Sequence, residues 1–216
     1  MRDDPLETFL SALATAVDAR APEGAPVASL QRLIFDRASQ PADTPAAALA
    51  SPPPEAEAGN VAQFVSRHLD AALDAIGGRE DDLSAVGQSF RALAGDLVWA
   101  RRPTGADDPP GFRDAHANAT IFGADGLEVR DDIRIGASLV APTITYPAHR
   151  HPPEELYLVL SGGDWRNSDH DWWTPGVGGL VHNPPGIEHA MRADDGPLFA
   201  IWCLLIDAPE TPSAAP

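Results

Sequence analysis

The segment 149–157, which reads His-Arg-His-Pro-Pro-Glu-Glu-Leu-Tyr, constrains the fold of this chain more than any other feature. His149 and His151 are two residues apart, so on an extended strand both side chains leave the same face. Glu155 and Tyr157 repeat this spacing after the diproline turn, on what we expect to be the next strand. The pattern therefore predicts two adjacent strands whose polar side chains face one cavity.

A second segment, Pro184-Pro-Gly-Ile-Glu-His189, adds a third histidine from a further predicted strand. Imidazole and carboxylate ligands together suit Zn, Fe, Mn or Ni, with positions left open for water or substrate. A surface position beside a turn is the plain alternative for any single histidine. Three histidines and one carboxylate in this arrangement favour a metal site. We therefore predict that His149, His151, Glu155 and His189 close around one divalent ion.

The spacing of both segments resembles the two motifs of the cupins. The first reads H-x-H-(x)3-E-(x)6-G and begins at His149, and the second reads G-(x)5-P-x-G-(x)2-H and ends at His189. The resemblance implies a small double-stranded β-barrel that carries a metal, but not one reaction, because this fold supports many chemistries. Thr143 stands where the first motif usually has glycine, and Ala193 where asparagine is expected after the last histidine. Neither position is a ligand in cupins.

The composition excludes several classes of partner. The 216 residues carry a net charge of −17 and a pI near 4.5, which argues against nucleic acid or an anionic membrane as a partner. The start of the chain is amphipathic rather than apolar, and no run of apolar residues is long enough to span a membrane. We therefore expect a cytoplasmic protein. The single cysteine, Cys203, lies in an apolar run, where we predict a buried thiol.

The N-terminal half carries the apolar periodicity of helices. The apolar stripes predict helices over 6–17, 28–37, 61–76 and 83–98. Residues 40–59 are rich in proline and alanine and predict a loop or an extended linker. We expect residues 1–100 to form a helical N-terminal region.

After residue 101, short β-type runs alternate with Gly, Asp and Pro turns. The candidate strands are 119–122, 133–141, 155–160, 180–182 and 198–206. Regular short strands separated by turns indicate a sandwich or a barrel. The predicted fold class is α+β, with an N-terminal helical layer packed on a C-terminal cupin (jelly-roll) metal-binding barrel over residues 112–208.

The two tyrosines of the chain both lie near the first motif. Tyr157 is in phase with Glu155 and should face the same cavity, whereas Tyr146 is out of phase with His149 unless Pro147 bends the strand. A free phenol has a pKa of about 10, but a nearby cation favours the tyrosinate, which is a strong base. Packing in a barrel core is the alternative for each ring. We take both tyrosines as candidate catalytic residues.

Further candidates for ligand contacts are aromatic. Trp165, Trp173 and Trp202 offer indole faces that suit a small cation, at about 0.5–2 kcal/mol for a good contact. Core packing is the alternative for each indole. His182 is expected to line the cavity without being a metal ligand, and His116 has no motif around it.

A helical region before a cupin, the segment 146–157 and His189 together resemble the cupin dimethylsulfoniopropionate lyases of marine bacteria. The resemblance covers the C-terminal half with its motifs and, more loosely, the helical half. It implies one divalent transition metal (Fe²⁺, Zn²⁺, Mn²⁺, Co²⁺ or Ni²⁺) held by His151, Glu155, Tyr157 and His189. It places His149 either among the ligands or beside the catalytic tyrosine, and it makes Tyr146 the base. A homodimer is expected at the level of the family alone.

The implied reaction is a β-elimination by a carbon–sulfur lyase on a small zwitterionic sulfonium substrate. A carboxylate bound at the metal would have a more acidic Cα–H. Tyrosinate 146 would remove that proton, and dimethyl sulfide would leave from Cβ, giving acrylate. General base catalysis supplies roughly 10²–10⁴-fold, so the metal must contribute much of the remaining acceleration.

Two other functions remain open on the sequence. The first is another cupin metalloenzyme, such as an iron dioxygenase or a sugar isomerase or epimerase. An isomerase of sugar phosphates would need basic residues around the pocket, where strand parity turns Arg150 away and leaves only Arg166 and Arg192 as candidates. The second is a non-catalytic cupin that binds a small molecule and works with a DNA-binding domain. The helical half is acidic and lacks a basic recognition helix, which argues against it.

Overall fold

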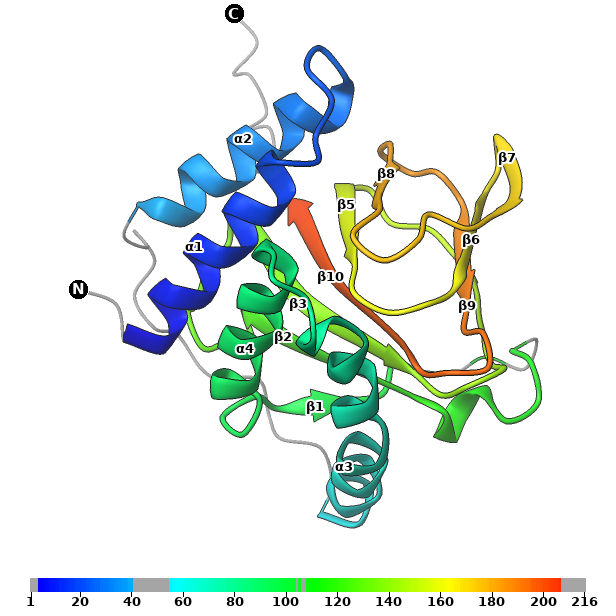
Figure 1. The fold of residues 1–216 in the computed structure, drawn as a ribbon. Helices are drawn as coiled ribbons and strands as arrows, with labels where there is room; N and C mark the ends of the chain where they lie inside the picture. Colours follow the sequence, from blue (N-terminus) through cyan, green and yellow to red (C-terminus); the bar gives the residue numbers. More distant parts are fainter. Residues whose placement is uncertain (1–3, 41–54, 104, 106–107, 207–216) are drawn as a thin grey trace, which may run out of the picture.

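The computed structural model describes residues 4–40, 55–103, 105 and 108–206. Within these ranges, four helices precede the main β-structure and lie to one side of it (Figure 1). They are α1 (Asp4–Asp18), α2 (Pro26–Ser39), α3 (Glu55–Gly77) and α4 (Asp82–Leu93). Of the predicted linker 40–59, residues 41–54 lie outside the described residues, and residues 55–59 belong to helix α3, so the prediction of a loop over 55–59 is wrong. Among the described residues, none of the helices is long and apolar enough to cross a membrane.

The predicted helices are confirmed, but the last one ends earlier than its apolar pattern indicated. Helix α4 stops at Leu93, whereas the pattern extended to residue 98. Gly95 follows the C-cap residue Ala94, and glycine is a poor helix former. The next apolar residues instead lead into strand β1 (Trp99–Ala100), which pairs with β2 (His116–Phe122). The prediction of a helix over 94–98 is therefore wrong.

The strands form two antiparallel sheets that face each other. The six-stranded sheet has the order β1, β2, β3 (Ile133–Val140), β10 (Leu198–Leu205), β5 (Glu154–Val159) and β8 (Leu180–Asn183). The four-stranded sheet has the order β4 (Thr145–His149), β9 (His189–Arg192), β6 (Asp164–Asn167) and β7 (His170–Trp173). A short 3₁₀ helix, η1 (Phe112–Asp114), precedes β2. The fold is the predicted α+β cupin.

The six-stranded sheet separates two cores because side chains alternate between its faces. One face packs against the helices and buries residues such as Leu156, Ile201 and Cys203. The buried Cys203 thiol agrees with the prediction, and burial raises its pKa. The other face looks toward the four-stranded sheet and carries Tyr157 and Trp202. The helices therefore support the sheet from behind and leave its inner face for the site.

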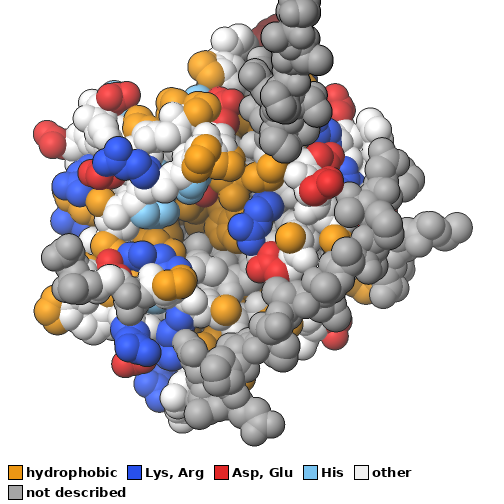
Figure 2. Space-filling view, turned by 180° about the vertical axis from the view of Figure 1, so that it is seen from behind, with side chains coloured by type: hydrophobic (Ala, Val, Ile, Leu, Met, Phe, Trp, Pro, Cys, Tyr) orange, Lys and Arg blue, Asp and Glu red, His pale blue; other side chains and the backbone are white. Residues whose placement is uncertain are grey.

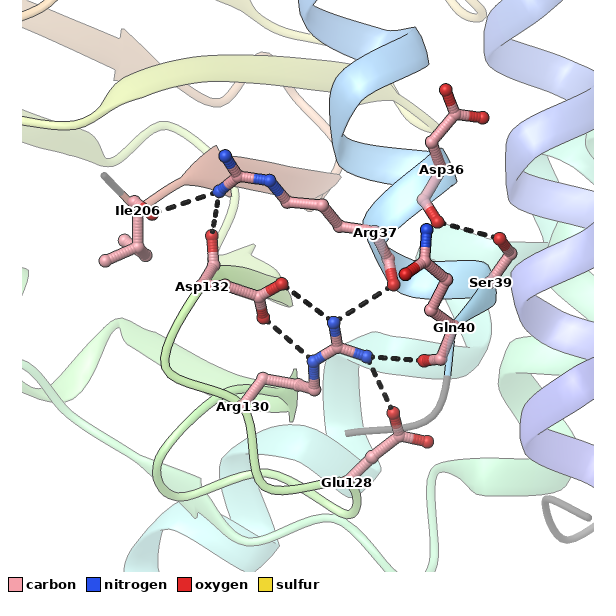
Figure 3. A network of polar contacts seen from close by, with 8 residues as sticks. All are labelled: Asp36, Arg37, Ser39, Gln40, Glu128, Arg130, Asp132 and Ile206. Carbon is pink, nitrogen blue, oxygen red and sulfur yellow. Dashed lines mark hydrogen bonds and ion pairs between the residues drawn. The ribbon is translucent and has the colours of Figure 1, made fainter. Parts of the chain in front are cut away.

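A buried arginine fastens the end of helix α2 to the β-structure (Figure 3). The Arg130 side chain is 5% exposed. Its guanidinium donates two hydrogen bonds to the Asp132 carboxylate at 2.9 and 2.8 Å and one to Glu128 at 3.2 Å. It also donates to the carbonyl oxygens of Arg37 and Gln40, at 3.0 and 2.8 Å. The Arg37 carbonyl also accepts from the Gln40 N–H at 3.0 Å, so Arg130 adds a second donor to the end of the helix and binds the residue that follows it.

Replacing Arg130 with alanine is expected to lower the free energy of unfolding by about 3 kcal/mol, because it strips buried or half-buried acceptors of their partner. Urea denaturation followed by circular dichroism measures the change. Arg32→Ala, at an exposed position of the same helix, is the matched control and should change stability by less than about 0.5 kcal/mol. Equal effects of the two substitutions would show that the Arg130 network does not hold α2.

The turn between β3 and β4 carries backbone strain at the position where cupins usually have glycine. Thr143 has a φ of 64°, in the left-handed region that disfavours β-branched residues. Its N–H donates to the carbonyl of Asp194 at 2.8 Å, which holds the turn in place. The departure from the motif that the sequence shows at this position therefore has an energetic cost.

Thr143→Gly is expected to raise the free energy of unfolding by about 0.5–1 kcal/mol, since relief of the left-handed strain outweighs the greater backbone entropy of glycine in the unfolded chain. The threonine side chain is exposed, so little packing is lost. Calorimetry measures the melting temperatures of Thr143→Gly and of Thr143→Ala, which keeps the Cβ. The comparison tests whether the Cβ causes the strain. A melting temperature that rises for alanine as much as for glycine would contradict it.

Candidate functional site

A β-bulge brings Tyr146 and His149 to the same side of strand β4. Tyr146 lies opposite Met191 and His149 lies opposite His189, so three steps along β4 match two along β9. The extra residue lies between these two positions, at Pro147 or Ala148, and a bulge turns the following side chain to the other face. The two rings are consequently 5.1 Å apart between centroids. The irregularity needed to bring Tyr146 into phase with His149 is therefore present between them.

His151 reaches the site from a turn rather than from a strand. Strand β4 ends at His149, and the turn then crosses from the four-stranded sheet to β5 in the six-stranded sheet. The prediction that His149 and His151 share one strand, and that this strand pairs with β5, is wrong. The backbone of His151 is instead held by the Gly186 N–H, which donates to its carbonyl at 3.0 Å. The site therefore lies where the two sheets meet.

The three motif histidines converge, and each has its Nδ1 atom near a backbone carbonyl. Potential ligand atoms of His149, His151 and His189 all lie within 4.8 Å of one another. Each Nδ1 lies at hydrogen-bonding distance from a backbone carbonyl two residues away, at 3.0, 3.0 and 3.1 Å, for the pairs His149–Pro147, His151–Pro153 and His189–Ile187. A carbonyl can only accept, so Nδ1 must carry the proton and Nε2 of the neutral ring keeps its lone pair. This arrangement orients histidines for metal binding.

Glu155 stands against two of these imidazoles. Its Oε2 atom lies 3.3 Å from Nε2 of His151 and 3.2 Å from Nε2 of His189, and it accepts a hydrogen bond from the Asn183 amide at 2.9 Å. Burial would raise the pKa of Glu155, but contacts with His151 and His189 lower it to about 2, so the group is a carboxylate. The same contact raises the pKa of His151, whereas burial lowers that of His149 to about 4.

These contacts fit a bound divalent cation. Nε2 of His189 is buried and has no hydrogen-bond partner among the described residues, although a carboxylate oxygen is close to it. A lone pair facing a carboxylate oxygen is repulsive unless a proton or a cation lies between them. A divalent ion would satisfy all three imidazoles and Glu155 at once. The donor set therefore matches the ion that the sequence predicts, without selecting its identity.

The histidines border a cavity of about 720 Å³ on the inner face of the six-stranded sheet. Figure 2 shows a hollow on the rear face of the molecule, with hydrophobic walls and with histidine and arginine side chains at its border. The predicted residues that line the cavity are Tyr146, His149, His151, Glu155, Tyr157 and Trp202. His189 lies directly behind them, 3% exposed and 4.2 Å from the His149 ring between centroids.

Three of the predicted substrate-binding residues lie elsewhere. Trp165 is 1% exposed and packs in the core between the sheets. Trp173 and His182 border a separate surface depression, and His182 pairs with Glu154 at 2.6 Å. Strand parity explains His182, because the next residue, Asn183, is the one that faces Glu155. Trp202 lines the cavity, but the Arg134 guanidinium already lies over its ring, 5.7 Å from the centroid.

The basic residues that line the cavity were not predicted from the sequence. Arg101, Arg102 and Arg134 line it together with Asn118 and Ser138, so the expectation that basic residues around the pocket are few is wrong. The signal was present in β2 and β3, where polar residues alternate with buried apolar ones. That alternation marks a strand with one face on a core and one face on a polar cavity. Arg101 and Arg102 gave no such signal because they follow a strand that was not predicted.

Tyr146 is the better placed of the two phenols for proton transfer. Its ring lies between Phe112 and His149, with centroid distances of 4.9 and 5.1 Å. The Asn118 amide donates to its hydroxyl at 3.4 Å, and the Ser138 hydroxyl fixes that amide by donating to its oxygen at 2.7 Å. Burial raises the pKa of Tyr146 to about 12, and burial also raises that of Tyr157 well above its usual value. Both phenols are thus protonated unless a cation lies near them.

Comparisons with known proteins relate the chain to one family. A sequence model of the dimethylsulfoniopropionate lyase family matches residues 38–200. The chain is 30% identical over 132 residues to the putative dimethylsulfoniopropionate lyase DddL of Cereibacter sphaeroides, a match covering 61% of this chain and 54% of that protein. It is 28% identical over 119 residues to dimethylsulfoniopropionate lyase DddQ of Ruegeria pomeroyi, covering 55% and 59%. The aligned region thus spans little more than half the length of either relative.

The crystal structure of the DddQ lyase from Ruegeria pomeroyi supports the fold. It matches this structure with a TM-score of 0.60 at 21% identity, covering 98% of this chain and 95% of that one. Helices and barrel are therefore both shared. Because the family match extends over most of its length, the chain belongs to the dimethylsulfoniopropionate lyase family.

Proposed function

We propose that this protein cleaves dimethylsulfoniopropionate to dimethyl sulfide and acrylate. The observation that carries the proposal is the contact between the Tyr146 phenol and the His149 imidazole, 5.1 Å apart between centroids, at the wall of one cavity. Tyr146 as a proton acceptor and His149 as a metal ligand could then act on the same small substrate. Family membership supports this choice among cupin reactions.

The residues assigned to metal binding are His149, His151, Glu155 and His189, with Tyr157 as a further candidate on the same wall. A divalent ion held there would polarise the substrate carboxylate and favour the ionised form of a neighbouring phenol. Fe²⁺, Zn²⁺, Mn²⁺, Co²⁺ and Ni²⁺ all accept such a mixed set of nitrogen and oxygen ligands.

The chain itself contributes the proton acceptor and its surroundings. The Tyr146 oxygen, as phenolate, takes the Cα proton of the substrate. The electron pair of the Cα–H bond forms the Cα–Cβ double bond of acrylate, and the electrons of the Cβ–S bond leave with sulfur as neutral dimethyl sulfide. The Asn118 amide, which donates to the Tyr146 oxygen, stabilises the phenolate. Release of the proton to water restores the base.

Measurement of dimethyl sulfide tests this proposal directly. Purified protein is incubated with dimethylsulfoniopropionate after chelation and after re-addition of each candidate metal, and the gas phase is analysed by headspace chromatography. Metal-dependent release with an equal amount of acrylate is the expected result. Absence of release with every metal, while the protein still binds metal, would exclude the lyase and leave a cupin metal site with another reaction.

A further inference from the structure

The cavity contains a guanidinium group whose charge is poorly compensated. The Arg101 side chain is 9% exposed, and its only ion-pair partner among the described residues is Asp114, 3.6 Å away and 79% exposed. Its Nε is buried and makes no hydrogen bond within the described part of the chain. A buried charge is costly unless a counter-charge and hydrogen bonds satisfy it. Among the described residues, the charge of Arg101 is therefore balanced only by the exposed Asp114, while its side chain lines the cavity.

Arg102 presents a second guanidinium to the same cavity and is held rigidly. Its backbone N–H donates to Nε2 of His116 at 3.0 Å. His116 is fully buried, stacks on Phe112 at 4.0 Å between centroids, and has Nδ1 2.8 Å from the Phe112 carbonyl. Burial lowers the pKa of His116 to about 4, so the ring is neutral and can accept from Arg102. The histidine without a motif thus positions an arginine.

The Arg102 side chain lies beside the proposed base. Its guanidinium carbon is 5.2 Å from the centre of the Tyr146 ring and 4.8 Å from that of Phe112. One nitrogen pairs with Asp108 at 2.8 Å, but Nε is buried and has no hydrogen bond to any described residue. Arg134 also has a buried Nε without a hydrogen bond to any described residue, but Asp125 and Thr120 engage its terminal nitrogen and its side chain is 40% exposed. Arg102 therefore adjoins Tyr146, and Arg101 lines the same cavity with only an exposed carboxylate as its ion-pair partner among the described residues.

We infer that Arg101 and Arg102 form a carboxylate-binding subsite that holds the carboxylate end of a small monocarboxylate ligand beside Tyr146. Arginine donors match a carboxylate in both geometry and charge, and such bonds are among the strongest hydrogen bonds in proteins. Assignment of the ligand as the lyase substrate rests on the proposed function. The subsite gives the carboxylate a hold that is independent of the metal and keeps Cα near the tyrosine oxygen. It also directs the sulfonium away from the guanidinium groups.

Propionate is a suitable probe because it has the carboxylate but no leaving group. Isothermal titration in low-chloride buffer measures its Kd for the chelator-treated protein and for the metal-loaded protein. We expect propionate to bind the metal-free wild type, and Arg101→Gln and Arg102→Gln each to weaken that binding by about 10- to 100-fold. Arg113→Gln, on the exposed face of η1, is the matched control and should leave the Kd unchanged.

A charge-preserving variant separates a specific subsite from a folding defect. Arg102→Lys keeps the charge but loses the planar fork, so it should weaken propionate binding less than Arg102→Gln at an unchanged melting temperature. Propionate that binds only to the metal-loaded protein, or with the same Kd in all variants, would overturn the subsite. Dimethyl sulfide release is scored separately. If propionate binds as expected but no dimethyl sulfide is released, only the lyase proposal is rejected. If dimethyl sulfide is released but the arginine substitutions leave propionate binding unchanged, only the subsite is rejected.

Discussion

Replacing His189 with alanine is expected to remove the bound divalent metal and to reduce dimethyl sulfide release by at least about 100-fold. Loss even of an outer hydrogen-bonding partner of a metal ligand typically costs about 10- to 100-fold, and His189 lies in the ligand set itself. A potential ligand atom of His189 lies within 4.8 Å of those of both other histidines, and its Nε2 lies 3.2 Å from Glu155. Elemental analysis of the purified variant gives the metal content, and headspace chromatography gives the activity.

His182→Ala is the matched control, because it removes a histidine that lies outside the cavity and pairs with Glu154 at 2.6 Å. Metal content and activity should both remain near those of the wild type. Circular dichroism of the two variants separates loss of ligand from loss of fold. If His189→Ala retains a full equivalent of metal, the three histidines do not form the metal site.

Tyr146→Phe is expected to reduce dimethyl sulfide release by roughly 10²–10⁴-fold, the range over which a general base contributes, while metal remains bound. The substitution keeps the ring contacts with Phe112 and His149. It removes the hydroxyl, to which Asn118 donates. The structure should therefore persist without its proton acceptor. The variant is assayed at a saturating substrate concentration, with metal content measured on the same sample.

Tyr157→Phe is the comparison that assigns the roles of the two tyrosines. Tyr157 faces the same cavity. Burial raises the pKa of its phenol, and the charge of Glu155 raises this pKa further. If Tyr157 is a metal ligand, the Tyr157→Phe protein should bind metal more weakly, and added metal should restore part of its activity. As the base, it would lose activity with metal fully bound. If Tyr146→Phe releases dimethyl sulfide at nearly the wild-type rate, and Tyr157→Phe loses activity with metal fully bound, the base is Tyr157 rather than Tyr146.

The periodic elements were predictable because their period reflects burial on one face. The helical stripes matched α1, α2 and α3, and the strand runs matched β2, β3, β5, β8 and β10. The end of α4 and strand β1 were not predictable, because the apolar pair at 97–98 fits either period. Strands β6, β7 and β9 were not predicted. Each has four residues, as does β8, which was predicted, so alternation alone does not identify strands this short.

The sequence by itself determined the cupin fold class and the set of metal-binding candidates, because motif spacing ties His149, His151, Glu155 and His189 to positions that any such barrel brings together. It also marked Tyr146, but only the bulge between Tyr146 and His149 turned that side chain toward the histidines. The tertiary structure alone decided the rest of the cavity. Arg101, Arg102 and His116 lie more than thirty residues before the first motif, and β1–β2 pairing places them there. Contacts between residues so distant along the chain depend on packing that local periodicity does not encode.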